Sequence, residues 1–291
     1  MRTNTVEELE LKKIVKDLIN IHNINCISLQ DITKEEEIGS GAQARVFRAK
    51  YGGNEVSLKL FKDVDWKSFA NEIVILSNLK HPNIPNFIGI VHDNLSIGLI
   101  FEFVPGLPLS KLNFPQFPDN IKLKLTKSLC NVLEYIHSKS FIHRDIKPDN
   151  ILVDNNYNLY LIDFGISKVC SNENGYTFTR IKGTIAYAAP EMIIEVGSDD
   201  NEERYCGINI KTDVWSVGVL LSYMYSGYYP WSNKYNSLDP TITQLLLLKT
   251  PFPIPDNIKD EKIKKIIELC TVIENDNRAY IQEINNLLKD M

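Results

Sequence analysis

An eight-residue stretch at positions 143–150 reads His-Arg-Asp-Ile-Lys-Pro-Asp-Asn, and an Asp-Phe-Gly tripeptide begins at position 163. The intervening residues 151–162 form two short apolar runs around an asparagine-rich turn, a pattern that is typical of a β-hairpin. A hairpin brings its two ends together. We therefore expect Asp145, Asn150 and Asp163 to lie side by side at one edge of a small sheet.

These residue types suit the transfer of a phosphoryl group. Asn and Asp supply hard oxygen ligands, and Mg²⁺ binds to a few of these together with phosphate oxygens. A carboxylate that does not bind the metal can accept a proton from an attacking hydroxyl. Lys147, two residues after Asp145, can place a positive charge beside the transferred group. A lone tripeptide of this kind occurs by chance, and an Asp-rich loop is usually a solvated turn. Chance does not explain the whole ordered string.

The two stretches resemble the catalytic loop H-R-D-x-x-x-x-N and the D-F-G motif of eukaryotic protein kinases. By this resemblance, Asp145 acts as the base or orienter of the substrate hydroxyl. Lys147 lies beside the transferred phosphoryl group, and Asn150 and Asp163 hold Mg²⁺.

The residues around Gly39 and Gly41 resemble the family's glycine-rich loop, G-x-G-x-x-G-x-V. Glycine lets the backbone come close to a phosphate, where a Cβ atom would obstruct it. The third glycine of the motif is Ala44 in this chain. The resemblance implies nucleotide contacts from Ile38, Gly39, Gly41 and Val46.

Lys59 stands where the family's V-A-I-K motif has its lysine, in an alternating segment 55–61 that is typical of a strand. Ser57 replaces the alanine of that motif. Glu72 lies on the apolar stripe of a predicted helix at 66–80, where a carboxylate is costly unless it is paired. We expect Lys59 to be its partner and, by resemblance, to hold the α- and β-phosphates of ATP. The alternative is a glutamate at the edge of the stripe that faces water.

The apolar run 98–106 ends in a Pro-Gly break and resembles the strand and hinge that join the two lobes of a kinase. The backbone of Glu102 and Val104 would bond adenine, and Phe101 would lie at the back of the pocket. Leu152 would form the floor of the adenine site.

Residues 163–191 resemble the activation segment, which ends in Ala-Pro-Glu. Arg144 stands where a family arginine can pair with a phosphate on this segment. We consider Thr177 or Thr179 as the phosphosite of an upstream activating kinase. The alternative is that these hydroxyl groups only belong to a polar loop.

Thr184 and Lys147 together favour Ser/Thr over Tyr substrates by resemblance. Glu191 is expected to be buried and paired with Arg278, and Asp213 to support the backbone of the catalytic loop.

Composition fits a soluble globular protein, with 291 residues, 44% hydrophobic and 24% charged residues, and a net charge of −5. Nothing in it favours a nucleic-acid partner. The uncharged run 214–231 contains Gly, Ser and Pro and fits a buried helix better than a membrane span. No signal peptide is recognised. The 5 cysteines form no C-x-x-C pair, which favours a reducing, cytoplasmic compartment over a disulfide or zinc framework.

Two segments do not resemble the family pattern. An amphipathic helix is expected within residues 1–31, either packed on the kinase domain or passive at the surface, from the spacing of Leu11, Ile14, Leu18 and Ile21. The acidic stretch 195–203 is expected to be a solvated loop, with docking of basic partners as the alternative.

The resemblance implies an α+β, two-lobed protein kinase fold, with a small antiparallel β-sheet N-lobe carrying one helix and a mainly helical C-lobe. The domains would be an N-terminal helical extension at 1–31, an N-lobe at 32–103 and a C-lobe at 104–291. The expected function is transfer of the γ-phosphate of Mg-ATP to Ser/Thr hydroxyls of protein substrates in signalling, in the tyrosine kinase-like group. The alternatives are a nucleotide-binding pseudokinase or scaffold and a kinase of small molecules.

Overall fold

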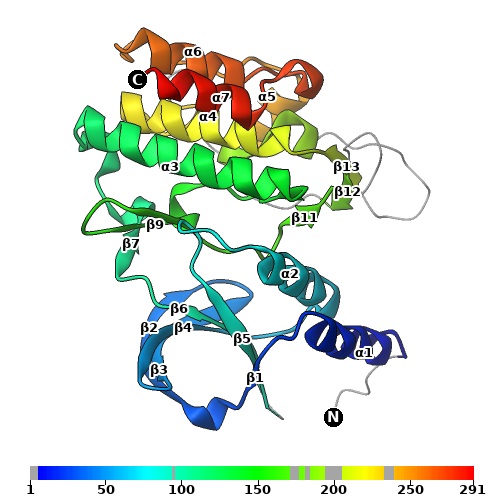
Figure 1. Ribbon diagram of the computed structural model, residues 1–291. Helices are drawn as coiled ribbons and strands as arrows, with labels where there is room; N and C mark the ends of the chain where they lie inside the picture. The colour runs from blue at the N-terminus through cyan, green and yellow to red at the C-terminus, as the bar shows by residue number, and fades with distance from the viewer. Residues whose placement is uncertain (1–5, 94–95, 171–176, 181–183, 194–204, 233–238) are drawn as a thin grey trace. The chain divides into compact units, whose positions relative to one another are not determined.

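A computed structural model describes residues 6–93, 96–170, 177–180, 184–193, 205–232 and 239–291 (Figure 1). The chain divides into two compact units, Met1–Pro105 and Gly106–Met291. The first carries a β-sheet, and the second is rich in helices, which agrees with the expected α+β class.

The sheet of the first unit has 6 strands in the order β1-β5-β6-β4-β3-β2. Its strands are β1 (Cys26–Ile27), β2 (Ile32–Ser40), β3 (Ala44–Tyr51), β4 (Asn54–Phe61), β5 (Phe87–His92) and β6 (Ile97–Glu102). Strands β2 to β6 pair antiparallel, but β1 pairs parallel with β5. The antiparallel sheet predicted for residues 32–103 is confirmed, and β1, which belongs to the segment before it, adds one parallel strand that the sequence did not predict. A strand of 2 residues is too short to show an alternating pattern.

Helices α1 (Val6–Ile21) and α2 (Trp66–Asn78) belong to this unit. Helix α2 was expected to reach residue 80 but ends at Asn78. The side chains of Ser77 and Asn78 donate to the carbonyl oxygen of Val74, which is how such residues compete with the helical backbone pattern. The expected apolar stripe is buried, with Phe69, Ile73, Leu76 and Leu79 all at most 7% exposed.

Helix α1 is amphipathic as predicted, but its buried face differs from the predicted one. Ile14 and Ile21 are 48% and 74% exposed, whereas Val15 is 5% exposed. The spacing rule located an apolar stripe, but the helix packs on α2 along an adjacent stripe that includes Val15. Of the two alternatives that the sequence left open, the packed helix is the one that the structure shows.

Hydrophobic side chains form the core of the first unit on one face of its sheet. Along β4 the side chains of Val56 and Leu58 are buried in this core, and Lys59 alternates to the opposite face. The buried members of the core are Ile27, Ile32, Ala49, Val56, Leu58, Val91 and Ile100.

The second unit consists mainly of helices, with short strand pairs beside them. Its helices are α3 (Asp119–Ser138), α4 (Lys211–Ser226), α5 (Asp239–Leu247), α6 (Glu261–Cys270) and α7 (Ile281–Lys289). Its strands are β7 (Gly106–Pro108), β8 (Phe141–Ile142), β9 (Ile151–Asp154), β10 (Leu159–Leu161), β11 (Lys168–Val169), β12 (Thr177–Arg180) and β13 (Tyr205–Ile208). Strands β9 and β10 form the predicted antiparallel hairpin, with Ile151 opposite Leu161.

No described helix is long and apolar enough to cross a membrane. The uncharged run that the sequence pointed to forms the buried helix α4, which ends at Gly227 in a left-handed conformation. None of the five cysteines, all of which lie in the described residues, forms a disulfide bond.

Helices α4 and α6 approach closely at Gly218. A Cβ atom at this position would lie 2.6 Å from Cys270 Cβ and 2.8 Å from Thr271 Cγ2. In an unhindered helix, Gly→Ala stabilises by about 0.5–1 kcal/mol. We predict the opposite sign for Gly218→Ala, a loss of about 1–3 kcal/mol from overpacking, measured by urea unfolding. A gain in stability would show that the two helices are not packed this closely.

Candidate active site

A buried ion pair joins strand β4 to helix α2. Lys59 Nζ donates to Glu72 Oε1 at 2.7 Å, and the two side chains are 15% and 3% exposed. Glu72 lies on the inward stripe of α2, and Lys59 lies on the strand face that does not enter the hydrophobic core. The alternative of a water-facing glutamate is therefore wrong, and the pair matches the expected partnership.

The Asp145 carboxylate is held by three neighbouring side chains. Lys147 Nζ lies 2.7 Å from Asp145 Oδ2, and Asn150 Nδ2 donates to the same oxygen at 2.8 Å. The Thr184 hydroxyl donates to Asp145 Oδ1 at 3.1 Å and accepts from Lys147 Nζ at 2.7 Å. With 13% of its side chain exposed, Asp145 is oriented by neighbours yet still reachable. This arrangement can take up a proton beside a fixed cation.

His143 links the catalytic-loop stretch to the end of the hairpin. Its Nδ1 accepts from the backbone N–H of Asp145 at 3.3 Å, and its Nε2 lies 3.1 Å from the carbonyl oxygen of Ile162. Because a carbonyl can only accept, the ring carries its proton on Nε2. The N–H of Ile162 in turn donates to the carbonyl of Asn150 at 3.0 Å. Asp163 follows directly, with a φ of 64°, so the backbone places it next to the Asn150 end of the hairpin.

Asp213, in the first turn of α4, bonds the backbone of the catalytic-loop stretch. Its carboxylate accepts from the backbone N–H groups of His143 and Arg144 at 2.8 and 2.7 Å, and from His137 Nε2 at 2.9 Å. Burial alone raises the pKa of Asp213, but the hydrogen bond and charge of His137 and the Arg144 N–H outweigh it, so the pKa lies below its usual value. The predicted support of the loop backbone is confirmed.

Nothing in the described parts of the chain requires glycine at the two glycine positions of the glycine-rich loop. Gly39 and Gly41 do not have positive φ angles. A Cβ atom would meet nothing closer than Val46 Cβ at 3.8 Å and Ala44 O at 3.9 Å, respectively. The expected close approach of a phosphate to these glycines stays a prediction. Val46 lies opposite Lys59 in the β3–β4 pair, and Ile38 is 39% exposed.

The expected adenine contacts lie on two elements that belong to different units. The N–H of Glu102, the last residue of β6, donates to the carbonyl of Asn86 at 2.9 Å. A bond from this residue to adenine would therefore use its carbonyl oxygen. Val104 follows and is 7% exposed. Leu152 lies in β9, opposite Tyr160 and Pro108.

The family model of the protein kinase domain matches residues 32–287, which is most of the chain. The chain belongs to the protein kinase family. Residues 6–31, with α1 and β1, precede the matched region.

Several curated kinases are similar to this chain. Mitogen-activated protein kinase kinase kinase 2 of Arabidopsis thaliana is 36% identical over 198 residues, which cover 67% of this chain and 29% of that protein. The rust resistance kinase Lr10 of Triticum aestivum is 30% identical over 209 residues, 66% of this chain and 31% of that kinase. A probable serine/threonine-protein kinase of Dictyostelium discoideum is 27% identical over 282 residues, 91% of this chain and 20% of that protein. The chain thus spans less than a third of the length of these kinases.

The kinase arginine that precedes Asp145 is buried. Arg144 is 2% exposed, and its Nη1 donates to the carbonyl oxygen of Ile166 at 3.0 Å. Burial lowers the pKa of its guanidinium. In this structure Arg144 therefore braces the start of the activation segment from inside, and its pairing with a phosphate stays a prediction.

Part of the activation segment pairs with a strand that follows the acidic stretch. Strand β12 runs antiparallel to β13, with Thr177 opposite Ile208 and Thr179 opposite Cys206. The sequence did not predict this pairing. The two candidate phosphosites thus lie on a hydrogen-bonded strand, whereas the acidic residues Asp199, Asp200, Glu202 and Glu203 lie outside the described residues.

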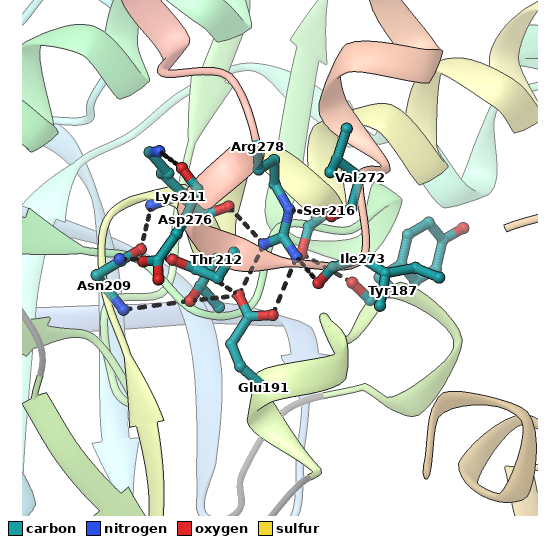
Figure 2. Close-up of polar contacts among 11 residues, drawn as sticks. Tyr187, Glu191, Asn209, Lys211, Thr212, Ser216, Val272, Ile273, Asp276 and Arg278 are labelled. Atoms are coloured by element: carbon teal, nitrogen blue, oxygen red, sulfur yellow. Dashed lines mark hydrogen bonds and ion pairs between the residues drawn. The ribbon is translucent and has the colours of Figure 1, made fainter. Parts of the chain in front are cut away.

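The predicted Glu191–Arg278 pair is present and is fully bonded (Figure 2). Arg278 Nη1 and Nη2 donate to the two oxygens of Glu191 at 2.7 and 3.0 Å. The remaining donors of Arg278 reach the carbonyl oxygens of Val272, Ile273 and Lys211, so all five N–H groups have acceptors. Thr212 and Asn275 also donate to Glu191.

The sequence interpretation missed the residues that hold these groups in place. His137 and Asn275 lie at positions where an isolated His or Asn gives no signal of its own, and His143 stood within the catalytic-loop motif but was given no role. A buried carboxylate such as Asp213 needs several donors, so the search for donors near it is the signal that would have pointed to them.

The residues that would hold Mg²⁺ have suitable chemistry. The amide nitrogen of Asn150 is engaged with the Asp145 carboxylate and carbonyl, which leaves its oxygen as the group that can bind a cation. With the Asp163 carboxylate this gives two hard oxygen ligands, and Mg²⁺ commonly binds to one or two such ligands plus phosphates. No group of three or more His, Cys, Asp or Glu in the described parts could hold a metal by itself.

We predict that Arg278→Ala lowers the free energy of unfolding by about 3–5 kcal/mol, because it leaves the Glu191 carboxylate buried without its cation. The control is Lys249→Ala, which removes an exposed pair with Glu274 whose side chains are 57% and 54% exposed. This control should cost no more than about 1 kcal/mol. Equal losses in urea unfolding would contradict the importance of the buried pair.

A second prediction concerns acid stability. The folded-state pKa of Asp213 is depressed, so its contribution is fully present above the unfolded value near 3.8 and is lost as pH falls through the folded pKa. Asp213→Asn should therefore be less stable than wild type at pH 7 and should lose less stability on acidification below about pH 4. Asp256→Asn, at an exposed carboxyl, should follow the wild-type pH curve. Parallel curves for all three would refute the assignment.

Proposed function

We propose that this chain is an active Ser/Thr protein kinase that transfers the γ-phosphate of Mg-ATP to a protein hydroxyl. The observation that carries the proposal is the set of contacts around Asp145, in which Lys147, Asn150 and Thr184 all reach one carboxylate. Each of these residues stands at the position that the family motif requires. A chain that had lost catalysis would not need this carboxylate, cation and hydroxyl together.

Asp145 orients the substrate hydroxyl and accepts its proton in this proposal. Its two oxygens are fixed by the three neighbours, so little rearrangement is needed when a hydroxyl arrives. Lys147 is within 2.7 Å of Asp145 Oδ2 and supplies the positive charge beside the developing negative charge. Positioned proton transfer of this kind is worth about 10²–10⁴ in rate.

Asn150 and Asp163 would hold Mg²⁺, and Lys59, fixed by Glu72, would hold the α- and β-phosphates of ATP. The cation neutralises phosphate charge when it is bound. The nucleotide would also contact Ile38, Gly39, Gly41 and Val46. The adenine contacts proposed above are Glu102, Val104 and Leu152.

Thr184 supports Ser/Thr as the acceptor type. Its hydroxyl bridges Asp145 and Lys147, which ties the end of the activation segment to the catalytic loop. The proposed partners are ATP, protein substrates and an upstream activating kinase. The similar kinases include a mitogen-activated protein kinase kinase kinase and a rust resistance kinase, and this similarity supports a role in signalling. The assignment to the tyrosine kinase-like group stays a prediction.

We predict that wild-type protein transfers γ-phosphate from Mg-ATP to a generic Ser/Thr protein substrate. Asp145→Ala should lose about 10²–10⁴ of the rate while remaining folded, because it removes positioned proton transfer. Asp163→Asn should abolish Mg-dependent transfer because it removes a metal-binding carboxylate. Asp290→Asn, at an exposed carboxyl, is the control and should behave as wild type.

Small alcohols assayed beside the protein substrate test whether the acceptor is a protein. If the wild type binds Mg-ATP yet transfers nothing, even after treatment with an activating kinase, the proposal is wrong and the chain is a pseudokinase. Preferential transfer to small alcohols would instead contradict the protein substrate.

A further inference from the structure

The segment before the kinase domain is built into the first unit. Helix α1 and strand β1 precede residue 32, where the family match begins. Both are attached to elements of the kinase sheet. Strand β1 pairs with β5, and α1 lies along α2, as Figure 1 shows within this unit.

The attachment at β1 is specific and includes backbone and side-chain bonds. The N–H of Ile90 donates to the carbonyl of Asn25 at 2.9 Å, and Asn25 Nδ2 donates to the carbonyl of Ile88 at 3.2 Å. The next apolar residue of the extension, Ile27, is 4% exposed and is part of the hydrophobic core of the sheet. The extension therefore completes the core of the first unit.

Gly89 on β5 shows how close this attachment is. A Cβ atom there would lie 2.4 Å from Asn25 O, 3.0 Å from Asn25 Cβ and 3.2 Å from Asn25 C. The three nearest atoms all belong to the extension. The absence of a side chain at Gly89 is thus needed for β1 to dock.

At the other attachment, α1 contacts the first turn of α2. Val15 is 5% exposed, and Lys12 Nζ lies 5.1 Å from the centre of the Trp66 ring. Trp66 is the first residue of α2. Its ring packs edge-on against the ring of Phe69, with 6.0 Å between the two ring centres. Phe69 is one turn before Glu72 on the same helix.

The contacts continue from Phe69 back to the catalytic lysine. The rings of Phe69 and Phe61 pack edge-on, with 5.3 Å between their centres. Lys59 Nζ lies 5.3 Å from the centre of the Phe61 ring. A packed series of side chains thus runs from α1 through Trp66 and Phe69 to the Lys59–Glu72 pair. Such close-packed series transmit displacement because protein interiors have little free volume.

We propose that α1 and β1 form a positioning element that holds α2 in place so that Glu72 stays bonded to Lys59. The inference deepens the proposed kinase function, on which its activity readout rests. The residues of the extension touch neither ATP nor substrate in this proposal. They act through the orientation of α2. Their loss should therefore lower kcat/KM even in protein that remains folded.

The test uses a matched pair of neighbours on α1 in the full chain. Val15→Asp places a charge on the buried face, and Ile14→Asp places the same charge at a position that is 48% exposed. We expect Val15→Asp to lower kcat/KM at least tenfold and to speed amide hydrogen exchange in α2. Ile14→Asp should stay within twofold of wild type in both. Equal behaviour of the two variants would overturn the proposal.

A double-mutant cycle separates positioning from a general loss of stability. In a Glu72→Gln background the pair is already broken, so Val15→Asp should lower kcat/KM by less than twofold further. If the two effects instead multiply, the extension acts only on stability and the proposal fails.

Two further measurements keep the outcome decisive. If Val15→Asp shows no cooperative unfolding transition, Gly89→Ala replaces it, because its added Cβ meets only the extension among its nearest atoms. The same loss of kcat/KM and faster α2 exchange are expected, and wild-type values for both would reject the inference. If wild type itself transfers no phosphate, the proposed function is at fault, whereas the exchange data still decide whether the extension holds α2.

Discussion

The chemistry of the second unit depends on the placement of one buried carboxylate, Asp213. A charge that is removed from water is costly unless it is paired and hydrogen-bonded. Asp213 recovers that cost from a histidine and from two consecutive backbone N–H groups of the loop that carries Asp145. Those two bonds fix the backbone of residues 143 and 144. The side chain of His143 then bonds the carbonyl oxygen of Ile162, which fixes the backbone immediately before Asp163.

Two other acidic side chains follow the same principle, Glu72, which is buried, and Glu191, which is 12% exposed. Glu72 has Lys59, and Glu191 has a two-pronged contact with Arg278 together with a hydroxyl and an amide. Replacing a buried pair by apolar residues is often neutral for stability, so these pairs are better understood as devices that fix geometry. Each pair joins two separate segments, which are 13 positions apart for Lys59 and Glu72 and 87 positions apart for Glu191 and Arg278. Removal of either partner therefore disturbs position and leaves a charge uncompensated.

Contacts between periodic elements could be predicted from their spacing, whereas the Glu191–Arg278 pair and the support from Asp213 were expected only from the family resemblance. The hairpin at β9–β10 and the Glu72–Lys59 pair followed from alternation and from a carboxylate on an apolar stripe. The packing face of α1 could not be predicted because two stripes on a short helix differ by a single residue, and only the partner decides between them. Strands β1 and β12 were missed because short strands owe their pairing to a distant backbone, which leaves no local pattern.

The parallel pairing of β1 with β5 also has a kinetic consequence. The strands β2, β3 and β4 are joined by short turns, so their pairing closes small loops. Cys26 must instead find Ile90, which lies 64 positions further along the chain (90 − 26). Longer loops cost more entropy to close, and non-local contacts tend to form late in folding. We therefore expect β1 to add to a sheet that already exists, so that this strand is among the last parts of the first unit to reach its native place.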